Sequence, residues 1–234
     1  MSDAKNGPVV LVAGASRGIG LGLVREYLSR GWRVIATQRD NGRDGSLNEL
    51  AKHSEGALTV ESLDINEPVQ IDALAQKLQG TALDLLIVNA GVSDDPNQTI
   101  AEISTDEFNR VMATNALSPL RVIERLARTV VANGTVAALS TALASISQNT
   151  TGGYETYRAS KAALNMLLRS YVARAGGDRT LLALMPGWVK TDMGGPDALV
   201  EIEDSVRGLA DTIAKRSGKP GLVFLDYQDQ EIAW

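Results

Sequence analysis

Near its N-terminus the chain reads Val9-Val10-Leu11-Val12-Ala13-Gly14-Ala15-Ser16-Arg17-Gly18-Ile19-Gly20, a short apolar run followed by three glycines. The apolar run predicts a buried strand, and the residues after it, as far as Arg30, predict a helix. Glycines at such a junction let the backbone turn tightly and approach a pyrophosphate, whose charge then rests on the helix N-terminus. The stretch therefore predicts a dinucleotide site, with an ordinary strand-to-helix turn as the alternative.

Strand-like and helix-like segments alternate along the rest of the sequence. The short apolar segments that read as strands are Val9–Val12, Arg33–Thr37, Ala57–Leu63, Asp84–Val88, Thr135–Leu139, Thr180–Leu184 and Leu222–Leu225. This alternation predicts an α/β fold, a doubly wound parallel sheet with helices on both faces and right-handed crossovers. No repeat or linker interrupts it, so we expect residues 1–234 to form one domain.

Ligands of such sheets bind beyond the carboxyl ends of the strands. Five motif residues each follow a predicted strand directly: Gly14, Asp64, Asn89, Ser140 and Pro186. We therefore expect them to lie along one edge of the sheet, where a ligand binds.

The composition narrows the function classes. Aromatic residues make up only 4% of the 234 residues, so aliphatic side chains must build the core, as expected for helices packed on a parallel sheet. The chain has no cysteine, and its single histidine, His53, cannot hold a metal alone. We expect no metal site and a solvent-facing His53.

Charge and hydropathy bear on partners and location. The net charge of −5 and the scattered basic residues argue against a nucleic-acid interface. No run of 18 apolar residues occurs, and no apolar segment precedes Val9. We therefore expect a cytoplasmic protein that binds neither nucleic acid nor a membrane.

Tyr157 and Lys161 are the first candidates for chemistry. Residues four apart lie on one face of a helix, so both side chains can reach the same ligand. A nearby cation favours the phenolate and brings the phenol pKa down toward neutral pH, which makes the tyrosine a usable acid. A surface tyrosine and lysine on an amphipathic helix are the alternative.

The surrounding motifs identify a family. The segment Tyr157–Asn165, together with Gly14-x-x-x-Gly18-x-Gly20, Val88-Asn89-Ala90-Gly91 and Pro186-Gly187-Trp188-Val189-Lys190-Thr191, resembles the short-chain dehydrogenase/reductase family over nearly the whole chain. The resemblance implies a Rossmann-type fold and hydride transfer between a nicotinamide and a carbonyl carbon of a small molecule. Ala13 departs from the threonine that the family usually has before its first glycine.

The resemblance also implies a set of cofactor-binding residues. They are Gly14, Ser16, Arg17, Gly18, Ile19, Gly20, Arg39, Asp64, Ile65, Asn89, Ala90, Gly91, Tyr157, Lys161, Pro186, Gly187, Val189 and Thr191. Asp64 and Ile65 would contact the adenine, and the segment from Pro186 to Thr191 would hold the nicotinamide.

The choice between NAD and NADP depends on the end of the second strand. An acidic residue there would bind the ribose hydroxyls of NAD, and none is present. Arg39 follows that strand and Arg17 lies in the glycine loop, so two guanidinium groups would clamp a 2′-phosphate. Asp40 would weaken this clamp by pairing with Arg39. The sequence therefore predicts NADP(H), with two loop arginines that bind no ligand as the alternative.

Two further polar positions complete the implied catalytic set. In the family, an asparagine at the position of Asn115 bends its helix and holds a water that links the lysine to solvent. The hydroxyl that polarises the carbonyl comes from Ser140 or Thr141, of which Thr141 occupies the slot that is commonly catalytic. Ser145 and Ser147, in the loop beyond the strand, rank behind these two.

Further stretches of the sequence bear on the branch of the family, on the size of the substrate and on the assembly. Tyr154 before Tyr157, the segment Thr191–Pro196 and the tail ending in Trp234 resemble the C-factor and sniffer branch of carbonyl reductases. About a dozen residues after Thr191 cover the pocket, which favours small aldehydes and ketones; Leu143, Gln148, Tyr154 and Trp188 are candidate lining. An NADPH-binding signalling protein with little turnover is the alternative function. The residues after Phe108 predict a helix whose apolar positions, as far as Val130 and Val131, are broader than one stripe, which suggests a homodimer or homotetramer.

Overall fold

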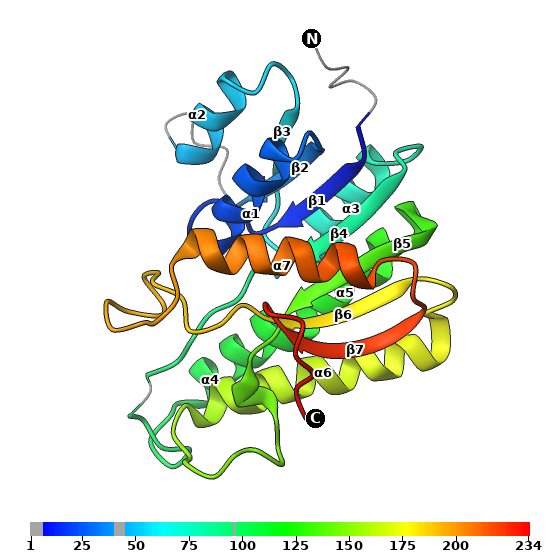
Figure 1. The fold of residues 1–234 in the computed structure, drawn as a ribbon. Helices are drawn as coiled ribbons and strands as arrows, with labels where there is room; N and C mark the ends of the chain where they lie inside the picture. The colour runs from blue at the N-terminus through cyan, green and yellow to red at the C-terminus, as the bar shows by residue number, and fades with distance from the viewer. Residues whose placement is uncertain (1–6, 40–44, 96) are drawn as a thin grey trace.

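The computed structural model describes residues 7–39, 45–95 and 97–234. Seven parallel strands form one sheet in the order β3-β2-β1-β4-β5-β6-β7 (Figure 1). The strands are β1 (Val9–Ala13), β2 (Arg33–Gln38), β3 (Leu58–Ser62), β4 (Leu83–Val88), β5 (Val130–Leu139), β6 (Thr180–Met185) and β7 (Gly221–Asp226). The predicted doubly wound, Rossmann-type sheet is confirmed, and all seven predicted strands are present.

Helices cover both faces of the sheet. They are α1 (Gly18–Ser29), α2 (Ser46–Lys52), α3 (Pro68–Lys77), α4 (Thr105–Met112), the π-helical turn η1 (Ala113–Leu117), α5 (Ser118–Leu126), the 3-10 turns η2 (Ala127–Thr129) and η3 (Ala142–Ala144), α6 (Glu155–Ala175) and α7 (Ile202–Arg216). None of the helices in the described part of the chain is long and apolar enough to cross a membrane.

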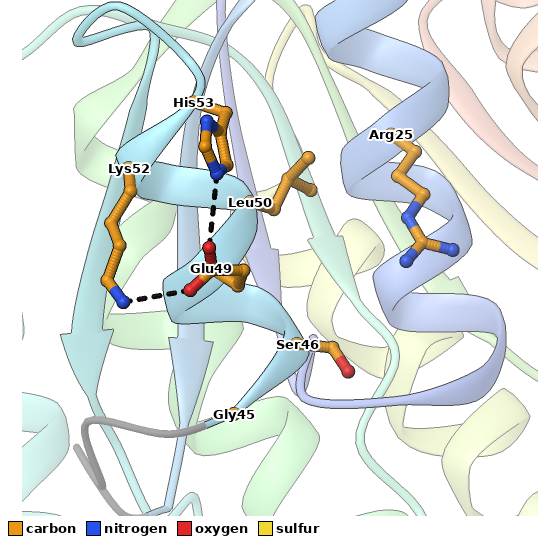
Figure 2. A pocket seen from close by; sticks show the side chains of 7 residues that line it. All are labelled: Arg25, Gly45, Ser46, Glu49, Leu50, Lys52 and His53. Atoms are coloured by element: carbon orange, nitrogen blue, oxygen red, sulfur yellow. Dashed lines mark hydrogen bonds and ion pairs between the residues drawn. The ribbon is translucent and has the colours of Figure 1, made fainter.

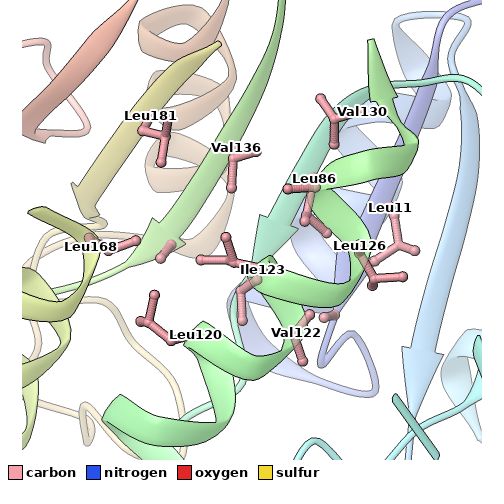
Figure 3. Close-up of a cluster of buried hydrophobic side chains, with 14 of the residues drawn as sticks. Leu11, Leu86, Leu120, Val122, Ile123, Leu126, Val130, Val136, Leu168 and Leu181 are labelled. Carbon is pink, nitrogen blue, oxygen red and sulfur yellow. The ribbon is translucent and has the colours of Figure 1, made fainter. Parts of the chain in front are cut away.

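The core has two layers because successive strand residues point to opposite faces. Val10 and Val12 pack with α1, α2 and α7, whereas Leu11 and Ala13 pack with α3, α5 and α6. Figure 3 shows the second layer, in which α5 residues such as Ile123 and Leu126 meet the strands. The central strands β1, β4 and β6 are buried on both faces and are therefore built mainly from aliphatic residues.

The order of the strands reverses at β1: β2 and β3 extend the sheet on one side of β1, and β4 to β7 extend it on the other side, where β4 pairs with β1. In open α/β sheets, ligands bind at such a switch point, outside the carboxyl ends of the strands. Gly14 follows β1 directly, and Asn89, Ser140 and Pro186 follow β4, β5 and β6 directly. Asp64 lies two residues beyond β3, so all five motif residues lie along one edge of the sheet, as predicted.

The helical interpretation of the residues after Phe108 was partly wrong. Val130 and Val131 begin β5, and the register between β4 and β5 shifts between Leu83 and Leu85. Most of the apolar residues in α4, η1 and α5 are buried within the chain, and Leu117 is the large one that is exposed. Packing on the sheet therefore accounts for the broad apolar band, and the homodimer or homotetramer stays untested.

Candidate active site

The glycine loop is packed too tightly for side chains. Gly14 has a φ of +87°, and a Cβ atom there would lie 2.8 Å from the Ala90 Cβ. A Cβ at Gly20 would lie 2.1 Å from the Gly14 carbonyl oxygen and 2.7 Å from Asn89 Nδ2. The two glycines therefore let the loop, the start of α1 and the end of β4 come together, as a backbone cradle for a phosphate requires.

Hydrogen bonds tie this loop to its neighbours. Asn89 Nδ2 donates to the Gly14 carbonyl (2.5 Å), and the Asn89 and Ala90 amides donate to the Ala13 carbonyl. The Gly14 amide donates to Thr37 Oγ1 (3.1 Å), and the Ala15 amide to the Thr37 carbonyl (2.7 Å). Thr37 was not among the predicted site residues, yet its buried hydroxyl on β2 supports the loop where Ala13 has no hydroxyl to do so.

The two predicted phosphate-clamp arginines are both exposed. Arg39 follows β2, where its carbonyl accepts a hydrogen bond from Ser62 Oγ (3.4 Å). The Arg17 guanidinium, at the N-cap of α1, forms an ion pair with Asp192 in the segment after β6. Both side chains of that pair are more than two-thirds exposed (69% and 78%), so the pair contributes little stability and can exchange for a ligand. Asp40, the expected partner of Arg39, lies outside the described residues.

Asp64 and Ile65 lie between β3 and α3. Asp64 Oδ1 accepts a hydrogen bond from the Asn66 amide (2.9 Å), which forms a tight local turn rather than a helix cap, and Ile65 is buried. Both residues therefore lie in the connection that follows β3, along the same edge of the sheet as Gly14 and Asn89.

The segment after β6 crosses back toward the glycine loop. Gly187 has a φ of +89° and packs against Tyr227, and buried Val189 pairs with Val200. Thr191 Oγ1 accepts a hydrogen bond from the Gly194 amide (3.1 Å). A Cβ at Gly18 would lie 3.4 Å from the Thr191 methyl group. Thr191 thus lies against the glycine loop at the start of α1.

Lys161 is buried in α6. Its Nζ donates a hydrogen bond to the carbonyl of Leu139, the last residue of β5 (2.8 Å). It also lies beside the Gly91 backbone, 3.4 Å from where a Cβ would be. Burial lowers the pKa of Lys161 to about 8, because a desolvated ammonium loses its hydration. Lys161 therefore joins the ends of β4 and β5.

Asn115 lies in the middle of the π-helical turn η1, between α4 and α5. It is fully buried, and its Oδ1 accepts from the Val92 amide (2.8 Å). Its Nδ2 donates to the Val92 carbonyl (2.8 Å) and to Ser160 Oγ (3.0 Å). A π turn inside a helix widens the backbone and often marks a functional site. The wide turn at Asn115 agrees with the expected bend, and its side chain links the segment after β4 to α6.

The structure gives Ser140 and Thr141 different roles. Ser140 is buried, and its Oγ donates to Asn165 Oδ1 (2.8 Å). Thr141 is half-buried, and its Oγ1 accepts from the Leu143 amide (3.2 Å), which leaves the hydroxyl hydrogen able to donate elsewhere. The geometry therefore favours Thr141 as the donor to a substrate oxygen. Asn165, the last residue of the segment Tyr157–Asn165, was not among the predicted site residues.

The second-ranked hydroxyls are engaged elsewhere. Ser145 is buried, and its Oγ accepts from the Gln148 amide (3.3 Å). Ser147 Oγ donates to the carbonyl of Trp234 (3.1 Å). These bonds agree with their lower rank.

The pKa of Tyr157 is shifted in the opposite direction to our prediction. Burial, followed by the negative charges of Asp94 and of an ionised Tyr154, raises it to about 12. The prediction that Lys161 lowers this pKa is wrong for this structure, in which the Lys161 ammonium is itself desolvated and bonded to the Leu139 carbonyl. The phenol is therefore protonated at neutral pH, the state from which it can donate a proton.

A cavity of about 570 Å³ lies away from these residues, between α1 and α2 (Figure 2). Arg25 lines it from α1, and on α2 both Lys52 and His53 contact Glu49 (2.8 and 3.1 Å). His53 is exposed, as expected. None of the predicted site residues lines this cavity.

A second cavity, of about 380 Å³, lies along η3 and the start of α6. Leu143, one of the candidate pocket residues, is among its lining. Gln148 is exposed, and the Tyr154 ring meets the Tyr157 ring edge-on with 6.5 Å between centroids. Trp188 is half exposed and donates to the Gly194 carbonyl (2.8 Å), so it does not belong to the core.

Comparisons with known proteins bear on the family of this chain. A family model described as short chain dehydrogenase matches residues 8–199. C-signal of Myxococcus xanthus is 40% identical over 156 residues, which cover 65% of this chain and 93% of that protein.

Solved structures match over almost the whole chain. One from Burkholderia multivorans with bound NADP, described only as a short-chain dehydrogenase/reductase, is 45% identical with a TM-score of 0.94, covering 97% of this chain and 99% of that one. A carbonyl reductase from Pseudomonas aeruginosa PAO1 in complex with NADP is 36% identical (TM-score 0.90; 98% and 100% covered). The carbonyl reductase Sniffer of Drosophila melanogaster is 26% identical (TM-score 0.87; 98% and 100% covered).

Proposed function

Since the chain belongs to the short-chain dehydrogenase family, we propose that it is an oxidoreductase that uses NADPH to reduce small aldehydes or ketones to alcohols. Its similarity to C-signal and Sniffer confirms the resemblance to the C-factor and sniffer branch. The similar structures from Burkholderia and Pseudomonas both hold NADP, which supports NADP(H) as the cofactor.

One observation carries the proposal: Lys161 and Asn115 both lie beside the segment that follows β4, and Lys161 is also bonded to the end of β5. Lys161 Nζ and Asn115 Oδ1 both lie beside Gly91, 3.4 and 3.3 Å from its would-be Cβ. Lys161 is bonded to the residue that precedes Ser140 and Thr141. Tyr157 is one helical turn from Lys161 in α6. This arrangement supports a site in which Tyr157, Thr141 and Lys161 act on one substrate beside the cofactor.

The residues present fit a bound dinucleotide. Gly14 and Gly20 leave a cradle that side chains would fill, at the N-terminus of the 12-residue helix α1. In the proposed arrangement this loop holds the pyrophosphate, and Asp64 and Ile65 hold the adenine. The residues that would hold the nicotinamide end are Pro186, Gly187, Val189 and Thr191. When bound, NADPH supplies the hydride that reduces the carbonyl carbon.

In the proposed reaction, the side chains of the site stabilise charge on the substrate carbonyl oxygen and supply its proton. The Thr141 hydroxyl donates a hydrogen bond to the substrate carbonyl, and this bond strengthens as negative charge builds on the oxygen. Tyr157 donates its proton to the same oxygen. Lys161 holds the nicotinamide ribose and, with Asn115, belongs to the path that returns a proton to the phenol.

Cofactor preference provides a first prediction. We expect the unaltered protein to prefer NADPH, and Arg39→Asp to shrink the NADPH-to-NADH ratio of kcat/KM by about tenfold or more, because an Arg–phosphate contact becomes a repulsion. Arg33→Asp is a matched control, since Arg33 is exposed at the opposite end of β2. Equal use of both cofactors by the unaltered protein would contradict the phosphate clamp.

The function itself is tested by following NADPH oxidation with a panel of aldehydes, ketones and diketones. We expect consumption of NADPH that depends on the carbonyl compound and yields the matching alcohol. Tight NADPH binding without consumption by any compound would instead support a signalling protein that binds the cofactor. The 40% identity to C-signal is the observation that keeps this second candidate.

A further inference from the structure

Asp94 is a buried carboxylate beside the proposed proton donor. It lies between β4 and α4 and is only 9% exposed, whereas its neighbour Asp95 is exposed. Asp94 Oδ2 accepts a hydrogen bond from the Tyr157 amide (3.3 Å). Its Oδ1 is buried and has no hydrogen-bond partner among the described residues. A carboxylate in such surroundings costs free energy, so its position calls for a physical explanation.

The first turn of α6 lacks a cap of its own. The N-cap residue, Tyr154, has a left-handed backbone (φ 52°), and its side chain makes no capping bond. Asp94 supplies an acceptor from 63 residues earlier in the chain. A negative charge at this end of a helix is also favoured by the helix dipole. The capped residue is Tyr157 itself.

A second contact holds the same segment against α6. The Ile100 amide donates to Glu155 Oε2 (2.7 Å), and Glu155 is the first residue of α6. In Figure 1 the connection from β4 to α4 and the loop before α6 lie together at the lower left. The two contacts thus fix the start of α6 relative to the segment that follows Asn89 and Gly91.

The charges around Tyr157 come from three elements. Asp94 approaches from the segment after β4, and Tyr154 and Lys161 lie on α6 or at its start. Arg110 of α4 is the cation that interacts with Asp94, but it forms its ion pair with Glu107 (2.6 Å) and donates to the Ser93 carbonyl. Asp94 forms no ion pair within the described part of the chain. Its charge is therefore left to act on the phenol.

We propose that Asp94 is a positioning residue for the reaction, which anchors Tyr157 through its backbone amide and keeps the phenol protonated through its negative charge. The inference rests on the proposed role of Tyr157 as proton donor. Carbonyl reduction needs a protonated phenol, whereas alcohol oxidation needs the phenolate. Asp94 therefore opposes formation of the phenolate and moves the onset of alcohol oxidation to higher pH. Asp94 also raises the pKa of Tyr157, in agreement with this role.

Asp94→Asn separates the charge from the cap, because an asparagine oxygen still accepts from the Tyr157 amide. We expect the acidic limb of the pH profile for NADP-dependent alcohol oxidation to move down by about one pH unit. Thermal stability should change little. Asp95→Asn, the same change at the exposed neighbour, should leave the profile in place. Asp94→Ser, which also keeps an acceptor without charge, serves as a second variant and should show the same shift.

A measurement without turnover separates this inference from the proposed function. In the full chain labelled with 13Cζ-tyrosine, the Tyr157 resonance, assigned with Tyr157→Phe, should titrate about one pH unit lower in both Asp94 variants. An unchanged titration in both variants would overturn the role of Asp94, even if the enzyme reduces carbonyls. A shifted titration in a protein that consumes no NADPH would support Asp94 and reject the proposed function.

Discussion

Replacing Tyr157 with phenylalanine is expected to lower carbonyl reduction by about 100- to 10,000-fold, the usual contribution of a general acid. The substitution removes the phenolic hydroxyl that is proposed to donate the proton, and it keeps the aromatic ring. The backbone bond to Asp94 and the glycine loop remain, so NADPH should bind with nearly unchanged affinity. Initial rates of NADPH oxidation and a fluorescence titration of NADPH binding measure the two quantities separately.

Two comparisons make this prediction specific. Tyr171→Phe is the same change on the same helix, at a buried position away from the site, and should leave turnover unchanged. Lys161→Ala should reduce both NADPH binding and turnover, because Lys161 is proposed to hold the nicotinamide ribose. More than about a hundredth of the original activity in Tyr157→Phe would contradict a general-acid role.

The fold could be predicted because most strands are short, largely aliphatic runs that are followed by a glycine, a proline or a polar residue. The start of β5 could not. Val130 and Val131 follow an apolar helix after only a short turn, and Gly134 interrupts the strand pattern. A Cβ at Gly134 would lie 2.6 Å from the Val130 side chain, so the strand bends sharply there. Tertiary contacts decide where this strand begins.

Local sequence motifs were enough to predict the glycine loop, Tyr157 and Lys161 as parts of the candidate site. Those that the sequence could not reveal act over long separations: Thr37, Asp94, Asn165 and Asp192. Asp94 and Asp95 read alike in the sequence, yet only Asp94 is buried against the active-site helix. The pKa of Tyr157 was misjudged for the same reason. A lysine one helical turn from Tyr157 predicts a lowered pKa for the phenol. Burial and the carboxylate of Asp94, which is far from Tyr157 in the sequence but close in the fold, raise that pKa.

This reversal fits the proposed direction of the reaction. A reductase needs its tyrosine protonated before the hydride arrives, and an unperturbed or raised phenol pKa satisfies that at neutral pH. Stabilisation of the developing negative charge must then come from elsewhere in the site. Thr141 carries the half-buried hydroxyl that remains for this role, which makes it the most informative residue to replace after Tyr157.

Thr141→Val keeps the shape of the side chain and removes the hydroxyl, so we expect turnover to fall by a factor approaching ~100. Ser140→Ala should instead act on stability. It deprives buried Asn165 of its hydrogen-bond donor, and Asn165 Nδ2 already lacks a partner within the described residues. We expect it to lower the free energy of unfolding by about 1–3 kcal/mol while most of the turnover remains. Rates of NADPH oxidation and urea unfolding of both variants test the pair. The opposite ranking would assign the oxyanion contact to Ser140, and full activity in both variants would move it to Ser145 or Ser147.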